Sequence, residues 1–293
     1  MSLFWLPPYG ALAHGTVTIT DVRVGFDGHF RVGFWTPVEV ALHSVGQQLA
    51  GQLSLSLIDG DGMRCETLGQ MVEVPAGGEV HVTAYAKFGS ERGDLTVALL
   101  DGERTLARRT FAVSEGGDHI GYRPGFASTQ GLILVLGNSL GLEEAVGRAR
   151  DQADKINVVT LSDAAQLPDD WLGYEAVDQL FIGPSPAGLD EALGERSPRL
   201  AALERWLTEG GRLTLALGAD SEHYLSSDRP LSRFVPGKLA GTANLTRTTS
   251  LEMFGGTYGG AALRWPRGER RVVAAARLSE VRGHVVLGEG DFP

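Results

Sequence analysis

A change of hydrophobic period near residue 114 constrains the fold of this 293-residue chain more than any other feature. From residue 16 to residue 114 apolar and polar residues alternate, as in "TVTITDVRV" and "EVHVTAYAK". After residue 130 the apolar residues come in short continuous runs such as "GLILVLG". Alternation turns one face of a strand inward and the other toward water, whereas a continuous run is typical of a strand buried in a parallel sheet. The chain is therefore expected to contain two domains of different class, which its length also favours.

The first half predicts an immunoglobulin-like β-sandwich over residues 15–114. Its alternating segments are short, roughly seven in number, and separated by turns rich in Gly and Asp. The disulfide of antibody domains is missing, because Cys65 is the only cysteine of the chain. Cys65 falls in an alternating segment, and we expect it to be a small buried hydrophobe rather than a reactive thiol.

The second half, residues 131–293, predicts an open α/β sheet of the flavodoxin-like class. Strand-like runs alternate with helical spacing, and β-branched residues fill the runs. The expected strands are 131–137, 155–162, 177–183 and 212–218, the expected helices are 142–153 and 199–209, and two more strands are expected within 270–290. Residues 115–130 contain glycines, a proline and no apolar stripe, so they are predicted to be a linker.

Two segments of the α/β half carry a family resemblance. "LPDDWLGYEAVDQLFIGP" followed by "ALERWLTEGGRLTLALG" resembles exported bacterial proteins, many of them planctomycete, that join a β-sandwich to a class I glutamine amidotransferase-like domain. The resemblance covers residues 131 to about 218 well, and the sandwich only in general style. It implies a catalytic cysteine on a sharp strand-to-helix turn, assisted by His and Glu. Because residues 131–293 contain no cysteine, the resemblance implies the scaffold of that family without its chemistry.

A serine nucleophile is the remaining enzymatic alternative. "LGADSEHY" places Asp220, Ser221 and His223 almost side by side, but neighbouring residues rarely assemble a catalytic triad. Glu222 and His223 also stand where a nucleophile elbow needs small residues. We therefore expect a polar loop or helix cap here. A diverged serine hydrolase using Ser221 or Ser185 stays open as a rival.

No motif of the sequence predicts a metal ion or another cofactor. "DGDG" at residues 59–62 begins like a calcium loop but continues without the required oxygen ligands, so we expect a hairpin turn. The histidines never occur at metal-ligand spacing. "GNSLG" at residues 137–141 offers a weak anion site at a helix start, without the full dinucleotide fingerprint. Trp171 and Tyr174 are expected to pack the loop before the third α/β strand.

A ligand of the α/β domain is expected at the carboxyl ends of its strands. Open α/β sheets bind ligands in the crevice where the strand order reverses. The candidate ligand-binding residues at this edge are Asn138, Ser139, Pro184, Ser185, Asp220 and His223.

Charge and the chain ends guide the functional hypothesis. A formal net charge of −10 argues against a nucleic-acid partner. No apolar run is long enough to span a membrane. Residues 1–14 are interpreted as a leader remnant or a disordered segment, and the end at Pro293 as a truncation soon after a strand.

We accordingly expect a non-catalytic binding or scaffold protein of the cell envelope, exported or membrane-anchored with this portion outside the cytoplasm. Its partner is expected to be a protein, with membrane attachment through segments outside this sequence. A carbohydrate-binding sandwich is the other alternative, with Trp35 and Tyr85 as stacking platforms, although Trp35 is better explained as a core residue. The Gly-rich segment 254–265 is expected to be a mobile loop.

Overall fold

The computed structural model describes residues 16–113, 122–148, 156–235, 237–244 and 272–278. The chain divides into two compact units, Met1–Phe126 and Ala127–Pro293. The predicted leader, the Gly-rich segment 254–265 and the last predicted strand lie outside the described residues.

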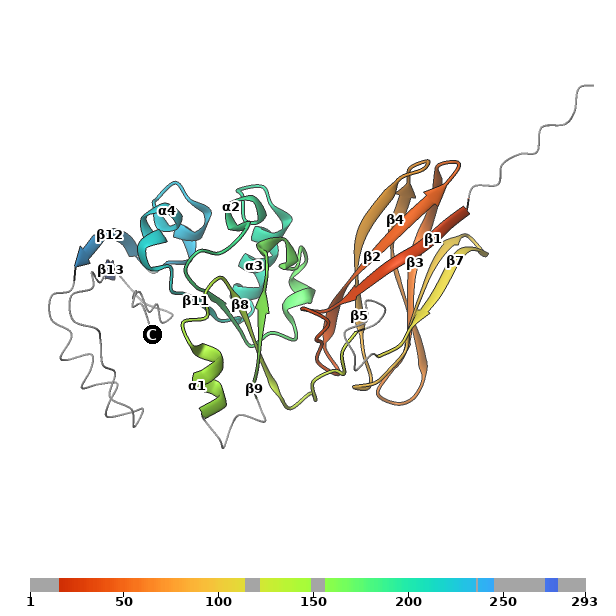
Figure 1. Cartoon of the computed structure of the whole chain (residues 1–293), viewed down its shortest axis with the longest axis horizontal. Coiled ribbons are helices and arrows are strands. Elements are labelled where there is room, and N and C mark those ends of the chain that lie inside the picture. Colours follow the sequence, from red (N-terminus) through yellow and green to blue (C-terminus); the bar gives the residue numbers. More distant parts are fainter. Residues whose placement is uncertain (1–15, 114–121, 149–155, 236, 245–271, 279–293) are drawn as a thin grey trace, which may run out of the picture. The chain divides into compact units, whose positions relative to one another are not determined.

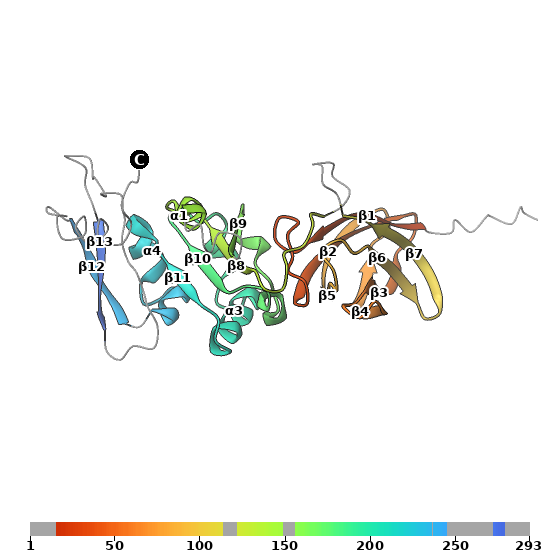
Figure 2. The same cartoon turned by 90° about the horizontal axis from the view of Figure 1, so that it is seen from below.

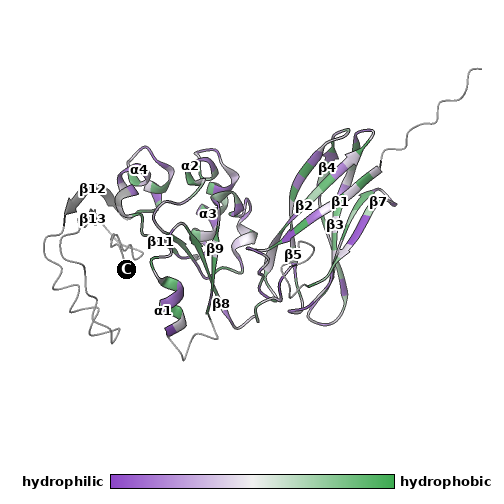
Figure 3. Cartoon of the chain, viewed as in Figure 1, coloured by the Kyte–Doolittle hydropathy of each residue, from purple (hydrophilic) through white to green (hydrophobic). Residues whose placement is uncertain are grey.

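The first unit is an antiparallel β-sandwich of two sheets (Figure 1). One sheet has the order β1 (Thr16–Val24), β2 (Trp35–Val45), β5 (Glu79–Lys87), and the other has the order β4 (Arg64–Val74), β3 (Leu49–Ile58), β6 (Leu95–Asp101), β7 (Arg104–Phe111). Hydrophobic and hydrophilic residues alternate along these strands (Figure 3). The inward residues of both sheets form one core that includes Val40, Leu53 and Val97. The predicted sandwich is confirmed.

Aromatic residues pack the segment after the last strand against this sandwich. Phe30, Phe88 and Tyr122 form a cluster with ring centroids 4.2–5.7 Å apart. The Tyr122 hydroxyl donates to the carbonyl of Gly93, and the N–H of Phe126 donates to the Phe30 carbonyl at 2.7 Å. Residues 122–126 are thereby held by contacts within the first unit.

Two side chains of the sandwich differ from expectation. Cys65 is exposed, and its Sγ donates to Asp59 Oδ2 at 3.2 Å. The predicted burial of Cys65 is wrong, because it lies near the start of the edge strand β4, which pairs with β3 alone among the described strands. Trp35 lies half-buried outside the core, with Lys87 Nζ 5.7 Å from its ring centroid. Its core placement is also wrong, because the even-numbered residues of β2, such as Val38, are the ones that point inward.

The second unit contains the predicted open parallel sheet. Its strand order is β9 (Ile156–Leu161), β8 (Gly131–Leu136), β10 (Gln179–Ile182), β11 (Leu213–Leu215). In sequence order this is 2-1-3-4, the beginning of the flavodoxin-like order. Two crossovers run in opposite directions along the sheet. One leads from β8 through α1 (Leu142–Arg148) to β9, and the other leads from β10 through α3 (Pro198–Thr208) to β11. Right-handed crossovers then place α1 and α3 on opposite sides of the sheet, as Figure 2 shows.

An aromatic pair fixes α3 to the chain before β10. Tyr174 ends a 3-10 helix (Trp171–Tyr174) that Asp170 caps at the Leu172 N–H. Its fully buried ring stacks on Trp206 of α3, with centroids 5.1 Å apart. Arg205 lies over the Trp171 ring at 4.6 Å. The expected packing role of Trp171 and Tyr174 is confirmed.

Beyond β11 the chain continues through short helices into a separate ribbon. The strands β12 (Gly237–Asn244) and β13 (Val272–Leu278) pair antiparallel. β13 matches an expected strand, whereas β12 was not predicted because its residues lack a clear apolar alternation. No helix in the described ranges is long and apolar enough to cross a membrane.

Candidate functional site

The carboxyl ends of β8 and β10 are joined by direct backbone contact. The N–H of Asn138 donates to the Pro184 carbonyl at 3.0 Å. A Cβ on Gly183 would lie 1.8 Å from the Asn138 carbonyl oxygen, which only glycine avoids. The two strand tips therefore leave no space between these residues for a ligand.

Ser185 follows this contact with a strained backbone. Its φ is +53°, in the left-handed region that residues other than glycine seldom adopt, and its side chain is exposed. Its N–H donates to Asp220 Oδ2 at 2.9 Å. Asp220 comes from the segment after β11, so its carboxylate ties a third strand tip to the other two. The structure thus brings together four of the six predicted residues, Asn138, Pro184, Ser185 and Asp220.

The "GNSLG" loop uses its polar groups internally. Asn138 Oδ1 accepts the Leu140 N–H at 2.8 Å, and the Ser139 carbonyl accepts the Leu142 N–H at 3.0 Å. The following helix, α1, has only seven residues in its described length. Ser139 therefore contributes to the turn before α1.

Ser221 begins α4 (Ser221–Leu225) and is buried. Its Oγ donates to the Gly218 carbonyl at 2.6 Å, so the hydroxyl serves the local backbone. The expected polar loop is helical instead, since a 3-10 turn (Gly218–Asp220) leads directly into α4. Asp220 does accept a backbone N–H, as expected of a cap, but from Ser185 rather than from its own helix.

His223, the sixth candidate, pairs with an acidic residue of another helix. Its Nε2 lies 2.7 Å from Oδ2 of Asp190 in α2 (Leu189–Ala192). Arg229 Nη1 contacts the other oxygen of the same carboxylate at 3.4 Å. The His223 ring also meets Tyr224 edge-on, with centroids 4.6 Å apart. Asp190 therefore connects α2 to two positions around α4.

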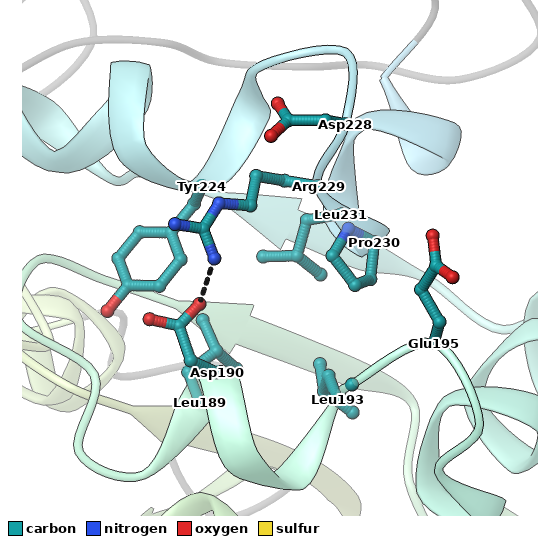
Figure 4. A pocket seen from close by; sticks show the side chains of 10 residues that line it. Leu189, Asp190, Leu193, Glu195, Tyr224, Asp228, Arg229, Pro230 and Leu231 are labelled. Carbon is teal, nitrogen blue, oxygen red and sulfur yellow. Dashed lines mark hydrogen bonds and ion pairs between the residues drawn. The ribbon is translucent and has the colours of Figure 1, made fainter.

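A cavity of about 250 Å³ opens beside this network (Figure 4). Its lining is Leu189, Asp190, Leu193, Gly194, Glu195, Tyr224, Asp228, Arg229, Pro230 and Leu231. Aliphatic side chains are combined with three carboxylates and one guanidinium, which points toward Asp190 in Figure 4. Burial, followed by the charges of Asp190 and Asp220, raises the pKa of Tyr224, so this phenol stays neutral at physiological pH.

None of the six predicted ligand-binding residues lines this cavity, although His223 contacts its lining through Asp190. The lining residues come from short helices and the turns that follow them, and they form no sequence motif. The sequence offered one weak signal for this cavity, the group of charged residues after residue 188. Such groups are common on solvent-exposed helices, so they do not by themselves indicate a binding site.

In the described ranges, no three His, Cys, Asp or Glu residues are grouped so that they could hold a metal ion. "DGDG" forms the expected hairpin turn, in which Asp59 Oδ1 accepts the N–H groups of Asp61 and Met63 at 2.9 Å.

Residues 17–114 match the model of a family described as a domain of unknown function (DUF8726). This match covers the sandwich and does not extend into the α/β unit. A comparison with curated protein sequences finds no match.

Solved structures give only remote likenesses. A cycloisomaltooligosaccharide glucanotransferase from Paenibacillus sp. is 12% identical with a TM-score of 0.26, over 71% of this chain and 30% of that chain. A β-glucuronidase from Bacteroides uniformis is 9% identical with a TM-score of 0.27, over 71% and 35% of the two chains. A β-glucosidase from Kluyveromyces marxianus is 13% identical with a TM-score of 0.23, over 40% and 16%. The chain therefore spans about a third or less of these enzymes, and such TM-scores carry no argument about function.

Proposed function

We propose that this chain is a non-catalytic, exported binding or scaffold protein of the cell envelope. Its second unit is, in this proposal, a class I glutamine amidotransferase-like scaffold without a nucleophile. The parallel strand order 2-1-3-4 supports this assignment, together with the segments around Trp171 and Trp206.

The observation that carries the proposal is the environment of Ser185. Its positive φ and exposure are those of a nucleophile elbow, but the next residue is Pro186. Such elbows use the N–H of the residue after the nucleophile to stabilise the oxyanion, and proline has none. The N–H of Ser185 itself is bound to Asp220, whose negative charge opposes an oxyanion nearby.

A serine hydrolase is the second candidate, favoured by the strained Ser185 and by the pair of His223 with Asp190. A carboxylate that orients a histidine is one half of a catalytic triad. The other half is missing, since within the described residues no hydrogen bond joins a serine hydroxyl to a histidine ring. Ser221 is buried against its own backbone. The binding function therefore has the better support.

We place the binding site in the cavity beside Tyr224. Arg229 is paired with Asp190, so the remaining lining charges are the carboxylates of Glu195 and Asp228. An apolar surface with excess negative charge favours a partner that inserts a Lys or Arg side chain with its aliphatic stem. The proposed partner is thus a protein segment that contains a basic residue.

A titration of the isotope-labelled full chain with hexalysine and with hexaglutamate, followed by amide NMR, tests this site. Hexalysine is expected to shift the signals of residues around Tyr224, whereas hexaglutamate leaves them unchanged. Glu195→Gln combined with Asp228→Asn should weaken hexalysine binding on the order of tenfold. Glu103→Gln, in an exposed turn of the sandwich, is the matched control. Equal binding of both peptides, or no effect of the double variant, would contradict the proposed site.

A further inference from the structure

The edge strand β4 differs from the opposite edge strand of its sheet. Among the described residues, five large hydrophobic side chains are exposed. Leu68 and Met71 lie in β4, Met63 lies in the turn before it, and Ile58 ends the neighbouring strand β3. β7, the opposite edge, contains three arginines instead. One of these, Arg109, donates to the carbonyls of Ile19 and Thr20 at 2.9 Å and so attaches its edge to β1.

β4 is a long edge strand that combines a bulge and charged residues with exposed apolar ones. It has 11 residues without proline or lysine, and its only hydrogen-bonded neighbour in the described sheet is β3. An exposed, partly apolar edge of this length can pair with a strand of another chain. The question is which strand fits it.

A bulge determines which residues of β4 face outward. Gln52 pairs with Met71 and Ser54 with Leu68, so β4 contains one extra residue between these pairs. The extra residue shifts the alternation by one position. Outward residues are therefore even-numbered before the bulge and odd-numbered after it: Arg64, Glu66, Leu68, Met71 and Glu73.

These outward residues match a second copy of the same strand. In an antiparallel pair with its two-fold axis between residues 68 and 69, Arg64 lies opposite Glu73 of the other copy, and Glu66 lies opposite Met71. Pairing is regular on both sides of the axis and is interrupted at residues 67–70, where the bulges of the two copies face each other. Symmetry repeats each pair, which gives two Arg–Glu contacts. A shift by two residues in one direction places Glu66 opposite Glu73, and a shift in the other direction leaves Glu73 without a basic residue opposite it. Of these three registers, charge favours the first.

We propose that two copies of this chain pair antiparallel along β4 in this register. The two four-stranded sheets then form one eight-stranded sheet (2 × 4), and the exposed Met71 gains Glu66 of the other copy as a cross-strand neighbour. The partner of this surface is a second copy of the chain, independent of the ligand of the α/β unit.

Sedimentation equilibrium of the full chain over a range of concentrations tests the pairing. The wild type is expected to dimerise, and Arg64→Glu to weaken the dimer on the order of tenfold, because it places like charges opposite each other twice. The double variant Arg64→Glu, Glu73→Arg should restore the dissociation constant to within about threefold. Arg108→Glu, the same charge change on β7, should have no effect. A wild type that stays monomeric up to roughly 1 mM, or a double variant as weak as Arg64→Glu, overturns the proposal.

Disulfide formation tests the register. In a Cys65→Ser background, Glu66→Cys and Met71→Cys together place two thiols opposite each other, where Cα atoms are about 4.5–5.5 Å apart, and a disulfide can form. Each single cysteine variant is the control, because its own copy lies five residues away along the strand. The double variant is expected to give a covalent dimer under mild oxidation and the single variants are not. Equal cross-linking of all three contradicts this register.

Discussion

The Asp220 carboxylate accepts the backbone N–H of Ser185 at 2.9 Å, across the carboxyl edge of the parallel sheet. This bond links the tip of β10 to the segment after β11. In enzymes that use this edge, amides of strand-tip loops commonly face the substrate. Here the amide is occupied by a carboxylate of the same chain.

Removal of the Asp220 carboxylate should loosen this edge. Asp220→Ala is expected to destabilise the chain by about 1–2 kcal/mol, because a charge-assisted hydrogen bond is lost and a strained backbone loses its support. Asp220→Asn keeps an accepting oxygen and should cost less than about 1 kcal/mol. Urea unfolding measures both. Equal stability of Asp220→Ala and the wild type would show that the bond does not support Ser185.

Gly183 and Gly147 should respond in opposite directions to alanine. At Gly183 a Cβ would lie 1.8 Å from the Asn138 carbonyl, so Gly183→Ala is expected to cost about 3 kcal/mol or more. Gly147 lies exposed in α1 with nothing within 4 Å of its Cβ position, so Gly147→Ala should stabilise by about 0.5–1 kcal/mol. Thermal unfolding distinguishes the two. A tolerated Gly183→Ala would refute the close contact of β8 and β10.

The Tyr174 hydroxyl is buried without a hydrogen-bond partner in the part of the chain that the structure describes. Burial raises the pKa of this phenol, so the group is neutral. Tyr174→Phe should therefore be neutral or slightly stabilising, since it removes an unsatisfied polar group and keeps the ring on Trp206. Tyr174→Ala should cost about 3–5 kcal/mol. If Tyr174→Phe instead destabilised by more than about 1 kcal/mol, the hydroxyl would have a partner.

The stability of the sandwich should depend on pH through His29. Burial, then the charge of Arg123, lowers the pKa of His29 below its ordinary value of 6.5. The unfolded chain then binds the proton more readily than the folded chain, so the stabilisation is complete above the unfolded pKa and is lost as pH falls through the folded pKa. The melting temperature should fall between about pH 7 and pH 5, and His29→Gln should reduce this slope. An unchanged slope in His29→Gln would assign the pH dependence to another group.

The spacing of hydrophobic residues predicted most of this architecture, because the burial of a strand determines which of its positions must be apolar. The runs around Leu134 and Leu215 contain consecutive buried residues, and burial alternates along β1 around Val22. Side chains at strand ends were less predictable. Cys65 has the spacing of an inward residue, but it lies near the start of an edge strand that has one paired neighbour among the described strands, and it is exposed.

The sequence predicted the positions of candidate site residues only where they directly follow the strands of the parallel sheet. Parallel strands end at one edge, so Asn138, Pro184, Ser185 and Asp220 meet there as expected. The contact between His223 and Asp190, which are 33 residues apart in the sequence, depends on the packing of two short helices. No local pattern encodes such a contact, and the cavity beside it was missed for the same reason.

The most direct test of the central claim is intact-mass measurement of the full chain after incubation with a serine-directed fluorophosphonate. A proline after Ser185 and a carboxylate on its amide predict no adduct on the folded protein beyond that of the Ser185→Ala variant. A stoichiometric adduct on Ser185 that is lost in His223→Ala would show an activated nucleophile and contradict the non-catalytic account.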